Sequence, residues 1–412
     1  MKRNLVAGLS ALLMTLAGIT PAAPGVASGS EDMTSQIIVK FRDDRAAARV
    51  LQQHGLSDGP GIGSTGAHLL NVPAGKEHQD IEALNRSPIV EYAEPDLVAT
   101  ATTADQYFPR QYSLQNDGQS FTNTAGTITV APGKADADVD AVEAWSVTTG
   151  NGIKVAVLDS GVATDNPDIS PKVVARANFS TARTNEDHYG HGTHVAGTVA
   201  ASMNNTIGIA GVCPGCTILA GKVLNDSGVG SSSSVANGIN WAVSNGARVI
   251  NMSIGVPASR TLETAVNNAW KNGAVLVAAA GNGNNQTKIY PAAYPNVIAA
   301  AATDNRDAKA PFSTYGASWV DIAAPGVNVF STFPNHPFVL GTQNNRSQGY
   351  DVGNGTSISS PIVAATAALV WSSTPGATAT AVRAKVESTA DKIAGTGTFW
   401  AKGRVNADRA VR

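Results

Sequence analysis

The feature that most constrains the fold of this chain is a regular alternation of short apolar runs with helical patterns. The runs are four to six residues long and mostly β-branched, as is typical of strands buried on both faces of a parallel sheet: Val155–Leu158, Ile218–Lys222, Val249–Met252, Val275–Ala280 and Val297–Ala301. The helical patterns are His194–Ser202, Ser234–Ser244, Thr261–Asn272 and, later, Ile362–Trp371. This order predicts an α/β fold with a mostly parallel central sheet. Functional residues are then expected just after each run, because ligands gather beyond the carboxyl ends of parallel strands.

Composition excludes several classes of protein. The chain has 412 residues, more than one typical domain of about 150. Its charged fraction of 15% and its lack of charge runs exclude a disordered chain, a coiled coil and an acidic tail. The 41 glycines and 20 prolines follow no collagen-like period. A net charge of −2 argues against a nucleic-acid partner.

The first residues have the pattern of a secretory signal. Lys2 and Arg3 precede an apolar stretch, Leu5 to Ile19, and a run of small residues follows. The stretch is too short to span a bilayer comfortably, and no later segment reaches about 18 apolar residues. We predict a signal peptide over residues 1–29 and a secreted, extracellular protein with no membrane segment in its mature form. The alternative is an uncleaved anchor.

Residues 30–101 differ in charge from the remainder of the chain. Residues 30–100 hold 6 basic and 11 acidic side chains, whereas residues 101–412 hold 21 and 20. The expected elements of this segment are the strands Ile37–Phe41, His68–Val72 and Ile89–Tyr92, and the helices Asp44–Gln53 and Glu77–Asn85. We predict a small α+β domain of marginal stability, followed by a linker and a large domain over residues 102–412.

Two motifs of the large domain carry an acid and a base. Asp159 follows the first apolar run and is either a turn former or a carboxylate held for chemistry. His191 and His194 stand in the segment Gly190-His191-Gly192-Thr193-His194. The two histidines could bind a metal, but no nearby side chain supplies the third ligand of a zinc site. His191 is better placed as a base at the start of a helix.

Two further motifs carry a hydroxyl and an amide. Pro361 fits only in the first turn of the following helix, which places Ser357 at or just before the helix N-terminus. Ser357 or Thr356 could simply cap that helix. Asn282 directly follows the fourth apolar run, where Asn-Gly is a common turn pair but where the amide could also donate to developing negative charge.

Taken together, the four motifs supply a nucleophile, a base, an acid that orients the base and a donor for an oxyanion. In this order, and with glycines around each, Asp159, His191, Ser357 and Asn282 resemble the subtilisin-like serine endopeptidases, specifically their thermitase-like branch. The resemblance covers essentially all of residues 105–412 and includes Tyr290-Pro291-Ala292, Ala323-Ala324-Pro325-Gly326 and the segment from Trp400 to Ala407. It implies a three-layer subtilisin-like fold.

The resemblance also implies a mechanism and an inhibitory propeptide. Ser357 would attack the substrate carbonyl, His191 would transfer the proton, Asp159 would orient His191, and Asn282 with the Ser357 N–H would bind the oxyanion. Residues 30–101 similarly resemble the propeptide of that family, which inhibits, assists folding and is removed autocatalytically. Protein and peptide substrates of broad sequence are expected partners, and the mature enzyme is expected to be a monomer.

The same resemblance assigns a substrate cleft and a calcium site. Substrate would lie between two extended edges, one with Ser227, Gly228 and Gly230 and the other with Ser253, Ile254 and Gly255. The specificity pocket would be walled by Ala279, Ala280 and Gly281, with Ile289 at its base. Oxygen ligands for Ca²⁺ would come from the side chains of Asp105, Asp168 and Asn205 and from the carbonyls of Met203, Ile207 and Ile209. The alternative is that these are turn and solvated loop residues. A second family calcium site is not expected, because Asn178–Asn185 lacks the necessary aspartates.

Cys213 and Cys216 lie where relatives usually have no cysteine pair. In an exported chain with two cysteines, a small-loop disulfide is favoured over a free dithiol or a metal site. Two other functions compete with proteolysis. An esterase or acyl transferase would use the same triad, and a secreted binding protein would keep the fold without turnover.

Ile358 follows Ser357 at a position where most relatives carry methionine. Oxidation of a methionine adds a polar oxygen beside the active site, and isoleucine cannot undergo this reaction. We predict slow loss of activity in dilute peroxide, measured as residual hydrolysis of a chromogenic peptide, with Ile358→Met as the sensitive comparison. Rapid inactivation of both proteins would contradict the prediction.

Overall fold

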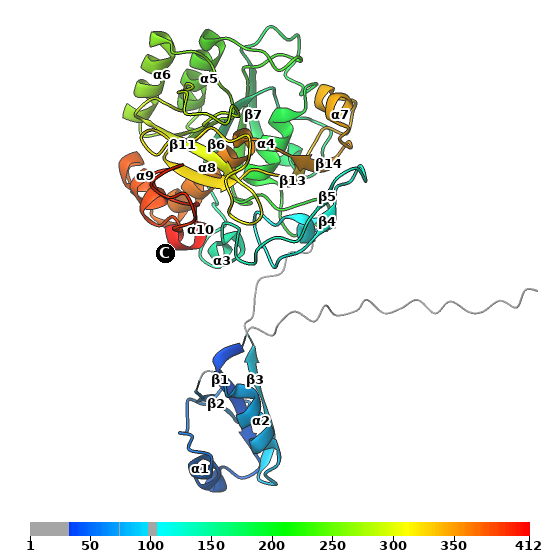
Figure 1. The fold of residues 1–412 in the computed structure, drawn as a ribbon, viewed down its shortest axis with the longest axis vertical. Coiled ribbons are helices and arrows are strands. Elements are labelled where there is room, and N and C mark those ends of the chain that lie inside the picture. Colours follow the sequence, from blue (N-terminus) through cyan, green and yellow to red (C-terminus); the bar gives the residue numbers. More distant parts are fainter. Residues whose placement is uncertain (1–32, 74, 98–104) are drawn as a thin grey trace, which may run out of the picture. The chain divides into compact units, whose positions relative to one another are not determined.

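The computed structural model describes residues 33–73, 75–97 and 105–412. Two compact units divide between Ala99 and Thr100, and each is described here by itself (Figure 1). The predicted signal peptide lies outside the described residues, as does most of the predicted linker.

The small unit is a three-stranded antiparallel sheet with two helices. Its elements are β1 (Met33–Phe41), α1 (Asp44–Gln53), β2 (Ala67–Asn71), α2 (Glu77–Asn85) and β3 (Val90–Leu97), and the strand order is β2-β1-β3. The predicted α+β character is confirmed. Strand β3 continues five residues past the predicted end at Tyr92. It is an edge strand, where Pro95 is tolerated because no neighbour needs its missing N–H.

The large unit is built on a seven-stranded sheet. Its strands are β6 (Lys154–Asp159), β7 (Val173–Asn178), β8 (Thr217–Lys222), β9 (Val249–Met252), β10 (Val275–Ala279), β11 (Val297–Thr303) and β12 (Ile322–Pro325). They lie in the order β12-β11-β10-β9-β6-β8-β7, and every pairing between them is parallel. The five apolar runs form the five inner strands. The two edge strands, β7 and β12, were not predicted.

Helices cover both faces of this sheet, giving three layers (Figure 1). Successive residues of β6 face opposite sides, so that Val157 packs with α4 (His191–Ala200) and α8 (Thr356–Ser373), whereas Leu158 packs with α5 (Ser232–Ser244) and α6 (Arg260–Lys271). The predicted α/β fold is therefore confirmed. Because both faces of the sheet are covered by helices, the inner strands are apolar at successive positions and do not alternate polar with apolar residues.

The remaining elements are short or lie at the periphery. They are the 3₁₀ turns Phe108–Arg110 and Ser170–Lys172, the hairpin β4 (Phe121–Thr122) and β5 (Thr129–Val130), α3 (Ala141–Trp145), the pair β13 (Val329–Thr332) and β14 (Tyr350–Gly353), α7 (Val339–Asn344), α9 (Ala379–Ser388) and α10 (Ala407–Val411).

Strand β6 lies at the point where the strand order reverses. Its neighbours are β8 on one side and β9 on the other, because the chain builds β7 and β8 first and then crosses to add β9 to β12. Crevices at such switch points are the usual ligand sites of open α/β sheets. Asp159 is the last residue of β6 and therefore stands at this crevice.

The start of α8 corrects one prediction. The helix begins at Thr356, so Pro361 is its sixth residue and not part of its first turn. A proline there leaves the carbonyl of Ser357, four residues earlier, without its helical donor. The hydroxyl of Ser253 donates to that carbonyl at 2.6 Å, which explains how the helix tolerates the proline. Helix α4 likewise begins earlier than predicted, at His191 and not His194.

Cys213 and Cys216 form a disulfide, with their Cα atoms 5.4 Å apart. Both cysteines are fully buried. A Cβ at Gly150, whose φ is +90°, would lie 2.0 Å from the sulfur of Cys213. The loop that carries the disulfide therefore packs directly against glycine backbone.

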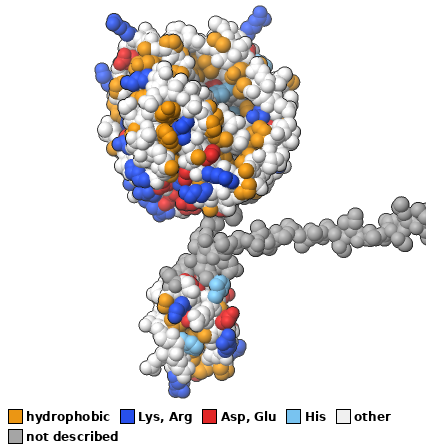
Figure 2. All heavy atoms as spheres, viewed as in Figure 1, with side chains coloured by type: hydrophobic (Ala, Val, Ile, Leu, Met, Phe, Trp, Pro, Cys, Tyr) orange, Lys and Arg blue, Asp and Glu red, His pale blue; other side chains and the backbone are white. Residues whose placement is uncertain are grey.

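Within the described residues, no helix is long and apolar enough to cross a membrane. Figure 2 shows mostly uncharged side chains over the visible face of the large unit, with a mixed group of acidic and basic side chains toward its lower end and other basic side chains scattered elsewhere. This distribution agrees with the low charged fraction of the sequence.

Candidate active site

Asp159 and His191 form a buried pair at the switch point. The Nδ1 atom of His191 lies 2.8 and 3.0 Å from the two carboxylate oxygens of Asp159, and the Asp159 side chain is almost fully buried. Burial alone would lower the pKa of His191. The charge of Asp159 and its hydrogen bond outweigh that effect, so that the pKa of His191 rises above its ordinary value of about 6.5.

The first turn of α4 is held by side chains from outside the helix. Asp187 is fully buried, and its carboxylate accepts from Ser160 Oγ, from the N–H of Gly190 and from both the N–H and the hydroxyl of Thr193, at 2.6 to 2.8 Å. Ser160 Oγ in turn accepts from the N–H of Gly192 at 2.9 Å. These bonds satisfy N–H groups that a helix N-terminus leaves unpaired, and they fix the backbone that carries His191.

Asn282 is fixed in orientation by the first residue of α8. Its Oδ1 accepts from the backbone N–H of Thr356 at 2.9 Å and from the Thr356 hydroxyl at 3.0 Å. The same hydroxyl oxygen accepts from the N–H of Gly281 at 3.0 Å. Because both neighbours of Oδ1 are donors, a flipped amide would face donor with donor. The NH₂ group of Asn282 is therefore the end left for a ligand.

Gly355 brings Asn282 and Ser357 together. A Cβ at Gly355 would lie 2.8 Å from Ser357 Oγ and 3.4 Å from Asn282 Nδ2, so a side chain would fill the space between these two groups. The φ of Gly355, +145°, is also one that other residues rarely adopt. Both the conformation and the close approach require glycine here.

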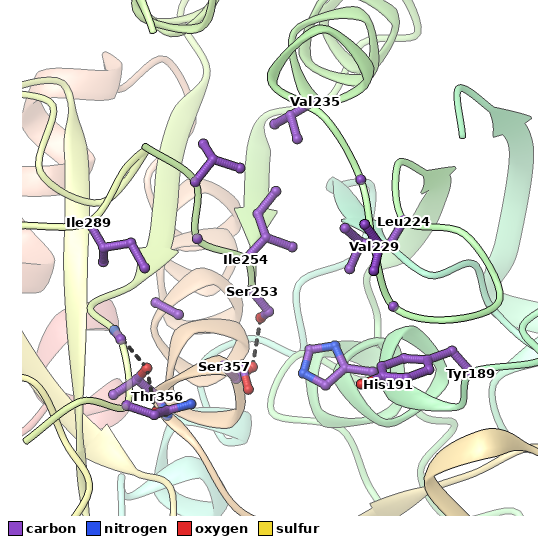
Figure 3. Close-up of a pocket in the computed structure, with 17 residues that line it drawn as sticks. Tyr189, His191, Leu224, Val229, Val235, Ser253, Ile254, Ile289, Thr356 and Ser357 are labelled. Carbon is purple, nitrogen blue, oxygen red and sulfur yellow. Dashed lines mark hydrogen bonds between the residues drawn. The ribbon is translucent and has the colours of Figure 1, made fainter. Parts of the chain in front are cut away.

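The four residues surround one crevice. His191, Ser357 and Asn282 line a cavity of about 460 Å³, with Asp159 directly behind His191. Figure 3 shows the imidazole of His191 beside Ser357 at the floor of this cavity. Eight of the ten predicted substrate-binding residues line the same cavity: Gly228, Gly230, Ser253, Ile254, Gly255, Ala279, Gly281 and Ile289.

Two predicted substrate-binding residues lie outside this lining. Ser227 is exposed in the turn closed by Asn225, whose side chain accepts from the Ser227 N–H. Ala280 is fully buried and borders a neighbouring cavity of about 370 Å³. Ile289 stands between the two cavities and lines both.

A third cavity, of about 360 Å³, opens on the other side of His191 and Ser357. We call it the α7 cavity, because Leu340 and Asn344 of α7 line it, together with Arg346 just beyond the helix. Helix α7 is tied to the segment before His191: the N–H groups of Val339 and Leu340 donate to the carbonyls of His188 and Tyr189.

The alternative of a metal bound by His191 and His194 fails on geometry. Nε2 of His194 lies 3.1 Å from the carbonyl oxygen of Val329, and its ring packs on Phe333. Burial lowers the pKa of His194 to about 3, so the ring is neutral. Across the described part of the chain, no three His, Cys, Asp or Glu side chains come together, so the two histidines have no third side-chain ligand for a site of the zinc type.

The six predicted calcium ligands share one loop and its two flanking carboxylates. Asp105 accepts from the N–H groups of Asn204 and Asn205 at 3.0 Å. Asp168 accepts from Asn205 Nδ2 and from the N–H of Ile209, both at 2.8 Å. Met203 and Ile207 belong to the same loop. Burial, with the charge of Asp105 as a smaller contribution, raises the pKa of Asp168 to about 7.

In comparisons with known proteins, the Subtilase family profile matches residues 150–405 and the fervidolysin N-terminal prodomain profile matches residues 22–96. The chain belongs to the subtilase family. Thermitase of Thermoactinomyces vulgaris is 47% identical over 276 residues, 66% of this chain and 94% of that protein. The thermophilic serine proteinase of Bacillus sp. (strain AK1) is 39% identical over 385 residues, 91% of this chain and 87% of that protein.

A similar fold occurs in a solved structure, titled as proteases from Pseudoalteromonas arctica PAMC 21717. It superposes with a TM-score of 0.64 at 28% identity, over 76% of this chain and 99% of that one. The predicted thermitase-like family, its fold and its enzyme class are thereby confirmed. This subtilase is a serine protease with an N-terminal prodomain.

Sequence reasoning missed several residues that shape the site of this subtilase. Asp187 carried no signal in the sequence because its importance lies in four hydrogen bonds from residues 3 to 27 positions away. Pro361 predicts an unpaired carbonyl at Ser357, four residues earlier, but nothing in the sequence identifies Ser253 as the residue whose hydroxyl donates to it. Helix α7 lines a cavity at the site, but its six residues are too few to show a helical pattern of apolar positions in the sequence.

Replacing Thr356 with valine tests how the Asn282 amide is held. The variant Thr356→Val keeps the side-chain shape but removes the hydroxyl that bonds both Asn282 and Gly281. We expect kcat to fall by about 10- to 100-fold with little change in KM, because a displaced donor loses part of the ~3 kcal/mol that such a group contributes to the transition state.

Thr366→Val is the matched control for this variant. Its hydroxyl is equally buried in α8 but bonds only the carbonyl of Ile362 within its own helix. The control should keep kcat. Equal loss in the two variants, or a rise of KM alone in Thr356→Val, would contradict the assigned role.

Proposed function

We propose that this subtilase is a secreted endopeptidase that hydrolyses peptide bonds through an acyl-enzyme, with Ser357 as nucleophile, His191 as general base and Asp159 as its orienting acid. The observation that carries the proposal is the buried Asp159–His191 pair on the same cavity as Ser357. The raised pKa of His191 strengthens it as a proton acceptor.

Each residue has one task in the proposed mechanism. His191 takes the proton of Ser357 as its Oγ attacks the substrate carbonyl, and later delivers that proton to the leaving amine. Asp159 accepts the Nδ1–H of His191, which leaves Nε2 toward Ser357 and stabilises the imidazolium that forms. Water then enters by the same route and releases the acyl group.

Asn282 and the backbone N–H of Ser357 are the proposed oxyanion donors. The NH₂ group of Asn282 is held toward the ligand side by Thr356, and Ser357 is the second residue of α8, where backbone N–H groups have no helical acceptor. Donors fixed in advance in this way stabilise a tetrahedral oxyanion without rearranging during the reaction.

Substrate is proposed to bind as an added strand. Gly228 and Gly230 stand on one side of the cavity and Ser253–Gly255 on the other, which offers main-chain bonds that do not depend on sequence. Ile289 limits the depth of the side-chain pocket: a Cβ at Gly255 would lie 2.1 Å from its Cδ1. We therefore propose broad specificity with an apolar, medium-sized side chain before the scissile bond.

The prodomain and the export signal complete the proposed life cycle. The fervidolysin-type prodomain match supports a precursor whose first domain inhibits the enzyme, assists folding and is removed autocatalytically. The N-terminal pattern of residues 1–29 and the disulfide both favour an exported protein. The mature enzyme is proposed to act as a monomer on proteins and peptides.

The loop 203–209 is the proposed calcium site. Asp105, Asp168 and Asn205 would supply side-chain oxygens and Met203, Ile207 and Ile209 carbonyls, a hard donor set of the kind that Ca²⁺ binds. The fit rests on two buried carboxylates that face the same loop, Asp105 through the N–H groups of Asn204 and Asn205 and Asp168 through Asn205 and the N–H of Ile209. Burial and the nearby charge of Asp105 raise the pKa of Asp168, and a cation would relieve both effects. A bound ion would link the chain segments that carry Asp105 and Asp168 to the loop after α4.

Replacing the nucleophile tests the proposed function directly. Wild-type precursor should convert to a shorter mature form, whereas Ser357→Ala should stay at full length and remain unlabelled by a serine-directed phosphonate. Ser372→Ala, at the far end of the same helix and bonded only to Thr148, should process normally. Processing is followed on gels and by mass spectrometry. If the purified Ser357→Ala precursor matured without added wild-type enzyme, Ser357 would not be the nucleophile.

The pH dependence follows from the raised pKa of His191. The base must be neutral, so kcat/KM should fall tenfold per pH unit as the pH drops below a pKa that lies above about 6.5. His336→Gln is the matched control, because His336 forms a similar pair with Asp165 at 2.8 Å but lies outside the cavities around Ser357 and reaches the site only at the backbone carbonyl of Asp187, 3.2 Å from its Nε2. The pH at which kcat/KM is half-maximal should be the same in His336→Gln as in the wild type. A shift of this pH in His336→Gln, or a value below the ordinary histidine pKa of about 6.5, would contradict His191 as the base.

Removal of calcium should lower thermal stability. At free calcium about a thousandfold above its Kd, the ion contributes about 4 kcal/mol, so chelation should lower the Tm of Ser357→Ala protein, which cannot digest itself, by about 8 °C. Magnesium should not restore the Tm. When Asp168→Asn is added to the Ser357→Ala protein, chelation should no longer change the Tm. If chelation lowered the Tm by the same amount as before, the ion would bind elsewhere.

A further inference from the structure

The α7 cavity lies on the leaving-group side of the proposed reaction centre. It shares Tyr189, His191, Asn282 and Ser357 with the cavity proposed to bind the acyl side of the substrate. The rest of its lining comes mainly from α7 and Arg346 just after it and from β14 and Asn354 just after it, and is completed by His194 of α4, Phe333 and Ile358 of α8. A peptide that crosses Ser357 with its acyl side between Gly228 and Ser253 must therefore continue into this space.

Charge within the α7 cavity is of one sign. Arg346 is the permanently charged residue among those that line it, and His194 is held neutral by burial. Asp351, the neighbouring acid, is fully buried, and its carboxylate accepts the N–H groups of Ser347 and Val352. The cavity thus presents a cation that its own lining does not neutralise.

Arg346 is held in place by backbone. Its Nε donates to the carbonyl of Val352 at 2.9 Å and its Nη1 to the carbonyl of Asn344 at 2.7 Å. Two bonds to fixed acceptors orient the planar guanidinium before any ligand arrives, so little side-chain entropy is lost on binding. Figure 1 shows α7 and β14, the strand that carries Val352, on the same side of the large unit.

A second donor faces the same space. Asn354 lines the cavity, and its Oδ1 accepts from the N–H of Asn328 at 2.7 Å, which leaves its NH₂ group as the donating end. Leu340, Val352 and Ile358 supply apolar walls. A guanidinium and an amide donor above apolar walls suit a short aliphatic chain that ends in a carboxylate.

We infer that Arg346 is a specificity-determining residue, and that the α7 cavity selects substrates with a carboxylate within the two residues after the scissile bond. The inference rests on the proposed endopeptidase function and names the substrate class of its leaving-group side. The carboxylate comes either from an Asp or Glu side chain or from the free C-terminus of a short leaving peptide.

The test uses quenched fluorescent peptides that share the same sequence before the scissile bond and differ only after it. At each of the two positions after the scissile bond, Glu is compared with Gln and Lys; a second series compares leaving dipeptides that end in a free carboxylate or a carboxamide. We expect kcat/KM for the carboxylate members of at least one series to exceed that for their neutral partners by about tenfold, an ordinary size for a charge-assisted hydrogen bond. Equal values in both series would overturn the inference.

Variants then assign the preference to Arg346. Arg346→Gln should abolish it and Arg346→Lys should keep part of it. The matched control is Arg306→Gln, since Arg306 also donates to a backbone carbonyl, that of Pro132, but lies outside the cavity. A preference that survives in Arg346→Gln would overturn the inference.

A peptide p-nitroanilide tests the proposed hydrolytic activity separately from the proposed preference for a carboxylate. Its leaving group carries no carboxylate, so the Arg346 variants should not show with this substrate the loss that they show with carboxylate peptides. Failure of the wild type to cleave it would count against the proposed function. A variant that loses this activity has lost its fold, and the wild-type comparison of Glu with Gln then decides the inference alone.

Discussion

The buried carboxylate at the end of β6 is the constraint on which the site depends. Asp159 stands where the order of the parallel strands reverses, and the sheet leaves a crevice there. A carboxylate in that position needs a partner, because an unpaired buried charge is costly. The imidazole of His191 provides the partner, and the first turn of α4 is shaped to bring it close: Gly192 has no room for a side chain, since a Cβ would lie 2.1 Å from the carbonyl oxygen of Gly161.

At the start of α8, backbone groups that the helix leaves unpaired are also satisfied by side chains of the site. A helix that begins at a reaction centre has unpaired N–H groups, and here one of them binds Asn282. Pro361 adds an unpaired carbonyl, at the proposed nucleophile Ser357, and the hydroxyl of Ser253 donates to it. Ser357 is therefore fixed through its backbone from the β9 side of the cavity, while its own hydroxyl stays on the cavity.

Much of the fold could be read from the sequence because the inner strands are buried on both faces and form continuous apolar runs. The edge strands β7 and β12 escaped for the opposite reason: β7 contains Arg176 and partly exposed positions, and β12 is four residues long and ends in proline. The candidate catalytic residues were recognisable because each lies near a glycine, at or just after the end of a strand for Asp159 and Asn282 and at the start of a helix for His191 and Ser357. Asp187, Ser253 and Arg346 were not, because what they do depends on partners that only folding brings near.

The disulfide has a consequence for how the protein can be made. Its cysteines are fully buried against the backbone of Gly150, so an oxidant or a reductant reaches the sulfur atoms only when this part of the large unit opens. The bond between Cys213 and Cys216 therefore forms most readily before the large unit folds, and folding protects it from reduction afterwards.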